Sequence, residues 1–207
     1  MIASPKPGCD IPESPLEESI PKSLIREIID GKPYYYKGYH EVLAGNIDAE
    51  GIMGCSTLQA FIVTYLVRVL LRSIDESQYL IATNEPGLHI NRRSNLASDI
   101  MVFDYDILTI DQINLNYAQV PPAVCIEVDT RVEFEEATES EYVTLKTMKL
   151  LEFGVGKVIW FFTETKKVMI ATPGSWTTFD WDHEVILMSG AVCNVGQYLR
   201  SKGLKIS

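Results

Sequence analysis

Two carboxylates and one lysine are the residues of this chain whose types and positions could support phosphate chemistry. Asp99 opens an apolar run that ends at Phe103, and Glu127 lies near the end of a second run, residues 123–128. Lys146 lies on the helix that we expect to follow. Two carboxylates on neighbouring strand ends can hold a divalent metal, and a nearby lysine can stabilise the charge of a pentavalent phosphate.

The helix expected over residues 139–153 carries Lys146 on an apolar face. On a helical wheel of about 100° per residue, Lys146 falls between Tyr142, Val143, Leu150 and Phe153, while Glu141, Thr144 and Glu152 fall on the other side. A lysine in such surroundings either extends its charged end to the helix edge or meets a buried anion. Asp99 and Glu127 are the anions at hand.

Each of these residues also has a purely structural interpretation. A carboxylate within an apolar strand is costly to bury unless it is paired or binds a metal. Glu127 and Lys146 can therefore form a structural salt bridge without any catalysis, in which case Glu127→Gln would mainly destabilise the fold. Asp99 taken alone can simply cap a turn. The three residues together argue for a site more strongly than any one of them.

The elements that must position these residues indicate a mixed α/β (α+β) fold. Apolar runs predict strands near residues 79–82, 99–103, 123–128, 157–163 and 167–171, and helical periodicity predicts helices over 57–73 and 139–153. We further expect an antiparallel pair from 176–181 and 184–188, a helix over 191–199 and a polar, hairpin-like loop over 91–98. Residues 1–20 contain four prolines and are expected to form a flexible N-terminal arm before a single domain over 21–207.

Composition narrows the classes of partner. The net charge of −10 argues against a generic nucleic-acid coat protein, although an acidic enzyme can still carry a local basic groove. The four cysteines include no CxxC pair, and no secretory signal is visible, so we expect a cytoplasmic location. The longest apolar stretch, 58–71, is too short to span a bilayer and contains Arg68, so no membrane association is expected.

Five short motifs occur in an order that resembles the Uma2 family. They are Glu27-Ile-Ile-Asp-Gly31, Ser98-Asp99-Ile-Met-Val, Pro122-Ala-Val-Cys-Ile-Glu127-Val, Lys146 eight residues before Gly154-Val155, and Val158-Ile-Trp160. The match extends over about residues 24–172. Uma2 proteins belong to the PD-(D/E)XK nuclease superfamily, so the resemblance implies a restriction-endonuclease-like fold, with a mixed central β-sheet flanked by helices.

The resemblance also implies a function, that of a metal-dependent DNA endonuclease. Asp99 and Glu127 would be the metal ligands, Lys146 the catalytic lysine, and Glu27 an acidic residue that supports the metal or positions water. In such an enzyme the two carboxylates and the backbone carbonyl of Val128 would hold Mg²⁺ or Mn²⁺. DNA is the expected partner, with Arg92, Arg93 and Lys37 as candidate phosphate contacts. Cleavage of both strands of a duplex is consistent with a homodimer.

The chain departs from the family pattern at three positions, which keeps a second hypothesis open. Ser98 replaces the usual proline, Asp129 stands where the wider superfamily motif has lysine, and Leu150 replaces a tyrosine. The alternative is a catalytically inactive nuclease-fold protein that serves as a DNA-binding or assembly module. The net charge of −10 and Asp129 favour this alternative, and metal-dependent phosphodiester cleavage distinguishes the two.

Overall fold

The structure is a computed structural model that describes residues 20–130, 132–133 and 138–205. The arm expected over residues 1–20 lies, apart from Ile20, outside the described residues. Within the described part of the chain, no helix has the length and apolar character needed to cross a membrane.

The central sheet of the fold is mixed, as predicted, and it has six strands. Its strand order is β10-β9-β8-β7-β6-β3, and only the central neighbours β7 and β8 are parallel. The strands are β3 (Tyr79–Thr83), β6 (Ile100–Asp104), β7 (Val124–Val128), β8 (Lys157–Phe162), β9 (Lys167–Thr172) and β10 (Ser175–Asp180). The fully buried sequence of β7, Val-Cys-Ile-Glu-Val, fits this central place because a central strand is covered on both faces.

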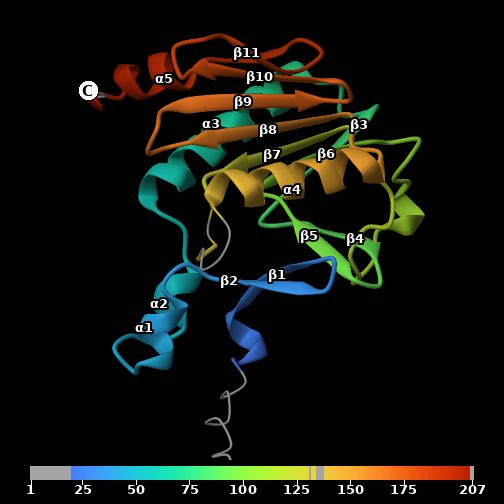
Figure 1. Ribbon diagram of the computed structural model, residues 1–207. Coiled ribbons are helices and arrows are strands. Elements are labelled where there is room, and N and C mark those ends of the chain that lie inside the picture. Colours follow the sequence, from blue (N-terminus) through green and yellow to red (C-terminus); the bar gives the residue numbers. More distant parts are fainter. Residues whose placement is uncertain (1–19, 131, 134–137, 206–207) are drawn as a thin grey trace, which may run out of the picture.

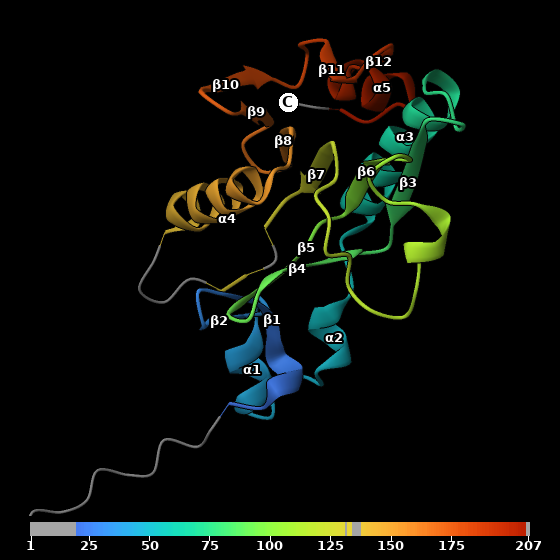
Figure 2. The ribbon, with the colours of Figure 1, turned by 90° about the vertical axis from the view of Figure 1, so that its right-hand side faces the viewer.

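Helices α3 (Thr57–Ser73) and α4 (Glu139–Phe153) cover opposite faces of this sheet (Figures 1 and 2). The stripe Ile62, Leu66 and Leu70 of α3 packs on one face in a core that includes Ile126 and Val128. Helix α4 packs on the other face, with the core residues Tyr142, Val143, Leu150, Met101, Cys125 and Trp160. Alternate residues of β6 and β7 therefore face either α3 or α4.

Helix α4 forms the crossover between the parallel strands β7 and β8, and both of its ends are fixed locally. At its start, Thr138 and Glu141 form a reciprocal capping box. At its end, Gly154 adopts the left-handed conformation with φ of 111°, and Gly154 and Val155 donate backbone hydrogen bonds to the last turn. These two caps fix the helical register, and hence the direction in which Lys146 points.

Replacement of Gly154 by alanine is expected to lower the free energy of unfolding by about 1–3 kcal/mol, because a side chain is strained at this positive φ. A Cβ atom at this position would also lie 3.1 Å from Pro121 Cγ. Urea denaturation provides the measurement. Gly174→Ala is the matched control, since Gly174 also has a positive φ but has open space around it. Equal losses in the two variants would show that the contact with Pro121 contributes nothing.

A second sheet, of order β2-β1-β5-β4, lies beside the α4 face and the end of the central strands (Figure 1). Its strands are β1 (Ile25–Ile29), β2 (Lys32–Tyr35), β4 (Gly87–Asn91) and β5 (Ser94–Ala97), preceded by the 3-10 turn η1 (Lys22–Leu24). Short helices α1 (Tyr39–Leu43) and α2 (Glu50–Met53) follow β2, and the 3-10 turn η2 (Ile110–Gln112) lies between β6 and β7.

Three of the sequence expectations were wrong. Residues 91–98 are not a loop, because they contain β5, which pairs with both β1 and β4. Residues 176–181 and 184–188 do not pair with each other, because β10 pairs with β9 and β11 (Val185–Met188) pairs with β12 (Ala191–Cys193). Residues 191–199 are therefore not one helix, and α5 covers only Val195–Ser201.

Candidate active site

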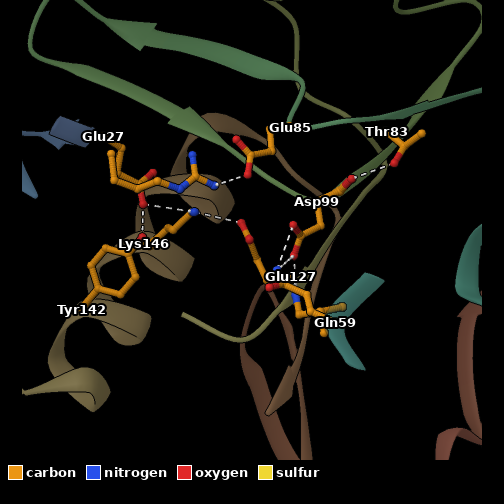
Figure 3. Close-up of polar contacts among 10 residues, drawn as sticks. Glu27, Gln59, Thr83, Glu85, Asp99, Glu127, Tyr142 and Lys146 are labelled. Carbon is orange, nitrogen blue, oxygen red and sulfur yellow. Dashed lines mark hydrogen bonds and ion pairs between the residues drawn. The ribbon is translucent and has the colours of Figure 1, made fainter. Parts of the chain in front are cut away.

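Strand register places Asp99 opposite Glu127. The β6–β7 ladder pairs Met101 with Cys125 and Ile100 with Ile126, and one further step in this antiparallel register pairs Asp99 with Glu127. Residues opposite each other on one face have Cβ atoms about 4.5–5.5 Å apart. The Glu127 side chain points to Lys146 on α4, whereas the Asp99 carboxylate lies at the strand end, where it also contacts Gln59 of α3. Figure 3 shows the two carboxylates near each other.

Lys146 lies between two glutamates and does not reach solvent. Its Nζ is 2.9 Å from Glu127 Oε1 and 3.1 Å from Glu27 Oε1, and its side chain is 2% exposed. Tyr142, one turn earlier on α4, donates its hydroxyl hydrogen bond to Glu27 (Figure 3). The rings of Tyr142 and Trp160 lie 5.9 Å and 5.6 Å from the ammonium, so aromatic faces complete its surroundings.

Burial and the neighbouring charges shift the pKa values of Lys146 and Glu27. Burial lowers the pKa of Lys146, but the charges of Glu127 and Glu27 outweigh it, so the pKa is raised and the ammonium stays protonated. Burial also raises the pKa of Glu27, and the attraction of Lys146 opposes this. Of the two anions expected to meet Lys146, Glu127 does so, whereas Asp99 forms no ion pair with it and Glu27 is the second partner among the described residues. Glu27 contacts Lys146 in this arrangement, and its predicted role toward a metal or water stays a prediction.

Asp99 is held by two donors that the sequence did not assign to the site. The backbone N–H of Val128 donates to Asp99 Oδ2 at 2.7 Å, and the amide of Gln59 lies 3.4 Å and 3.5 Å from its two oxygens. Gln59 belongs to the buried stripe of α3, three residues before Ile62, and a polar residue in such a stripe was the available signal. Burial and the charge of Glu127 raise the pKa of Asp99 to about 7.

This raised pKa predicts a pH dependence of stability in metal-free protein. The folded state holds a proton on Asp99 up to about pH 7, whereas an unfolded aspartate releases it near pH 3.9. The contribution of Asp99 is therefore greatest below about pH 4 and is lost as the pH rises through 7. Asp99→Asn should remove this fall, measured as the pH dependence of urea unfolding in the presence of a chelator. Identical profiles for the two proteins would contradict the raised pKa.

Two of the three departures from the family motif have structural explanations. Asp129 has a positive φ of 63°, and its carboxylate accepts hydrogen bonds from the backbone N–H and hydroxyl of Thr163, which ties the end of β7 to the end of β8. Ser98 is buried, and its backbone N–H donates to the carbonyl of Pro86, which a proline could not do. Leu150 is a fully buried core residue.

The carboxylates lie between a narrow pocket and an open cleft. The narrow pocket has a volume of about 10 Å³, enough for about one water molecule. Its lining includes Asp99, Glu127, Lys146 and Arg26. Asp99 also lines an open cleft of about 430 Å³, together with Gln59 and Glu85. Asp99 and Gln59 line both spaces, whereas Glu127 lines the narrow pocket and not the cleft, so an ion or a water molecule in the cleft can reach Asp99.

The donors at this position fit a divalent metal such as Mg²⁺. The β6–β7 ladder ends at Ile100, so the backbone of Val128 forms no ladder bond to β6. The N–H and the carbonyl of a strand residue point to the same side. Because the Val128 N–H bonds Asp99, the Val128 carbonyl also points toward Asp99. Among the described residues, the carboxylates of Asp99, Glu127 and Glu27 lie beside two cations, Lys146 and Arg26, so negative charge is in excess once Asp99 is ionised. No cluster of three His, Cys, Asp or Glu side chains suited to a metal occurs among the described residues. A metal here would thus have two carboxylates, a carbonyl and water, a typical set for Mg²⁺.

Arg93, one of the expected phosphate contacts, is engaged elsewhere. The Arg93 guanidinium donates to the backbone carbonyl of Asp30 at 2.5 Å, and the Arg93 carbonyl accepts from Gly31. These bonds join the β4–β5 turn to the β1–β2 turn. Neither Arg92 nor Lys37 lines the narrow pocket or the open cleft described above. The described cation that does line the narrow pocket with Lys146 is Arg26, which the sequence did not single out.

Comparison with solved structures shows what this fold is similar to. A protein from Anabaena variabilis, described as "a putative nuclease belonging to DUF820", superposes with a TM-score of 0.56 over 80% of this chain and 82% of its own, at 17% sequence identity. DUF820 is the Uma2 family. This chain is Uma2-like in fold. The expected fold class is thereby confirmed, with its mixed central sheet flanked by helices.

The two other comparisons add nothing to this likeness. No family model matches the sequence. No curated protein matches it either. At 17% identity this likeness establishes the fold alone, and function depends on the residues of the site.

Proposed function

We propose that this chain is a metal-dependent nuclease that hydrolyses phosphodiester bonds of DNA, with Mg²⁺ or Mn²⁺ as cofactor. The observation that carries the proposal is the β6–β7 register, which sets Asp99 and Glu127 opposite each other, with Lys146 2.9 Å from Glu127. The likeness in fold to a protein described as a putative nuclease supports it. We propose DNA rather than RNA as the substrate because the five sequence motifs resemble those of the Uma2 family.

Each residue of the site has a defined task in this proposal. Asp99, Glu127 and the Val128 carbonyl would hold the metal, which when bound supplies a Lewis acid and an activated water. Lys146 remains protonated and directs its ammonium toward the reacting phosphate, where it stabilises developing negative charge. Glu27 and Tyr142 fix the position of Lys146, and Gln59 fixes the carboxylate of Asp99.

Calorimetric titration with Mn²⁺ tests the carboxylate site directly. Wild-type protein is expected to bind Mn²⁺ saturably, and Asp99→Ala and Glu127→Ala are expected to lose this binding. Asp106→Ala is the matched control, because Asp106 is an exposed aspartate outside the site. If folded wild type binds no Mn²⁺, alone or with a DNA duplex present, the proposal is wrong.

A competing hypothesis is an inactive nuclease fold that binds DNA or assembles with a partner. Its specific support is that Lys146 lies within ion-pair distance of two glutamates, an arrangement that a structural ion pair alone would also produce. Incubation of supercoiled plasmid DNA with Mg²⁺ or Mn²⁺ separates the two. Cleavage that stops on chelation supports the enzyme, whereas metal-independent binding without cleavage supports the inactive relative.

A further inference from the structure

Arg26 is a buried cation with unused hydrogen-bond donors. Its side chain is 8% exposed, and its one ion pair among the described residues, to Glu85 Oε1, is long at 3.4 Å. The guanidinium makes no hydrogen bond to any residue in the described ranges, although it carries five N–H donors. Besides Glu85, the guanidinium contacts the ring of Tyr36, whose centroid is 5.8 Å away. Guanidinium donors without an acceptor that line an open cleft can bind an anion from solution.

A β-bulge turns Arg26 toward the site. The β1–β2 register shifts between Ile25 and Glu27, so Arg26 is the extra residue of the strand. In a regular strand, neighbouring side chains would point to opposite faces, but a bulge can redirect one of them. Here Glu27 bonds Lys146 while Arg26 lines the same narrow pocket as Asp99, Glu127 and Lys146.

Glu85, the partner of Arg26, lies where the open spaces around the site meet. It lines the 430 Å³ cleft that contains Asp99 and also a second cleft of about 500 Å³, which Arg26 and Lys22 line as well. Both Asn84 and Glu85 have positive φ angles, of 70° and 58°. Two successive non-glycine residues in this conformation are strained, and such strain is common at functional sites.

We propose that Arg26 is a phosphate-binding residue of the site and that Glu85 is its partner only until substrate arrives. A phosphodiester oxygen then takes the place of the Glu85 carboxylate, and the planar fork of the guanidinium holds the phosphate beside Asp99, Glu127 and Lys146. The inference rests on the proposed function, because the phosphate that Arg26 binds is the group to be hydrolysed. It assigns to Arg26 the binding of this phosphate, a role that the proposed function gave to no residue.

Fluorescence anisotropy with a labelled DNA duplex in the presence of Ca²⁺, at several salt concentrations, tests this inference. Arg26→Met should weaken binding about tenfold or more and reduce the slope of log affinity against log salt by about one. Arg93→Met removes the same charge from a guanidinium already bonded to Asp30, and it should leave the slope unchanged. Glu85→Gln removes the competing anion and should strengthen binding by up to about fivefold.

The outcomes separate this inference from the nuclease proposal. An unchanged salt slope in folded Arg26→Met, or no duplex binding by wild type, overturns the role of Arg26. If Arg26→Met does not fold, Glu85→Gln decides: tighter binding supports the role, and unchanged or weaker binding makes the ion pair merely structural. Mn²⁺ calorimetry on the same proteins reports on the metal site alone. A lower slope in Arg26→Met without any Mn²⁺ binding would support Arg26 and reject the metal-dependent nuclease.

Discussion

Exchange of Lys146 for methionine is expected to lower the free energy of unfolding by about 3–5 kcal/mol, because it leaves two buried glutamates without their cation. Glu27 and Glu127 both lie within 3.1 Å of the ammonium, and all three side chains are almost fully buried. Methionine fills a similar volume, so the loss reports on charge rather than on a cavity. Urea denaturation at pH 7.5 gives the value.

Lys149 provides the matched control on the same helix. It forms ion pairs with Asp30 and Glu152, but its side chain is partly exposed, and surface pairs contribute only about 0–1 kcal/mol. Lys149→Met should therefore change stability little. The loss in Lys146→Met should also shrink toward acidic pH, where the abandoned carboxylates take up protons. Equal effects of the two substitutions would show that the buried ion group contributes nothing special to the fold.

Asp99→Asn is expected to reduce metal-dependent DNA cleavage by about a thousandfold or more. Loss of one of two carboxylate ligands removes several kcal/mol of charge stabilisation, and each 1.4 kcal/mol corresponds to about a factor of ten in rate. Asparagine keeps the size of the side chain and can still accept the hydrogen bond from the Val128 N–H. The expected loss is therefore one of chemistry with the fold intact.

The measurement is single-turnover cleavage of plasmid DNA in Mn²⁺, with circular dichroism to confirm folding. Asp106→Asn is the control, because Asp106 is exposed and outside the site. Activity in Asp99→Asn equal to wild type would place the reaction elsewhere on the protein, or in a contaminant, and would remove the main support for the proposed mechanism.

The part of the site that could be predicted from the sequence is the part encoded by local periodicity. Lys146 fell on the apolar side of its helix, and Glu127 interrupted an apolar strand, so both were visible as buried charges. Gln59 and Arg26 were not assigned to the site. The position of Gln59 depends on how α3 packs against Asp99, and that of Arg26 on a bulge between two strands. Such non-local contacts leave little trace in one sequence.

The fold errors have similar physical reasons. In β5 one buried residue is Ser94, whose hydroxyl accepts a hydrogen bond from the N–H of Asp30, so the apolar alternation typical of a strand is masked. The pairing of the last strands follows from two short turns instead of from proximity along the chain. Pro173-Gly174 joins β9 to β10, and Ser189-Gly190 joins β11 to β12, both with glycine at a positive φ.

Because side chains alternate between the two faces of a strand, the β6–β7 register that sets Asp99 opposite Glu127 depends on the exact number of residues in each strand. One residue inserted in β7 before Glu127 would exchange the faces of the residues that follow it, and Glu127 would then point away from Lys146. The connection between these strands, residues 105–123, lies outside both of them and carries no such constraint. A change in the length of that connection therefore leaves the facing of Asp99 and Glu127 unaltered, provided that Ala118 keeps its backbone hydrogen bonds to Gly87 and His89 of β4. A change of length inside either strand preserves the facing only in steps of two.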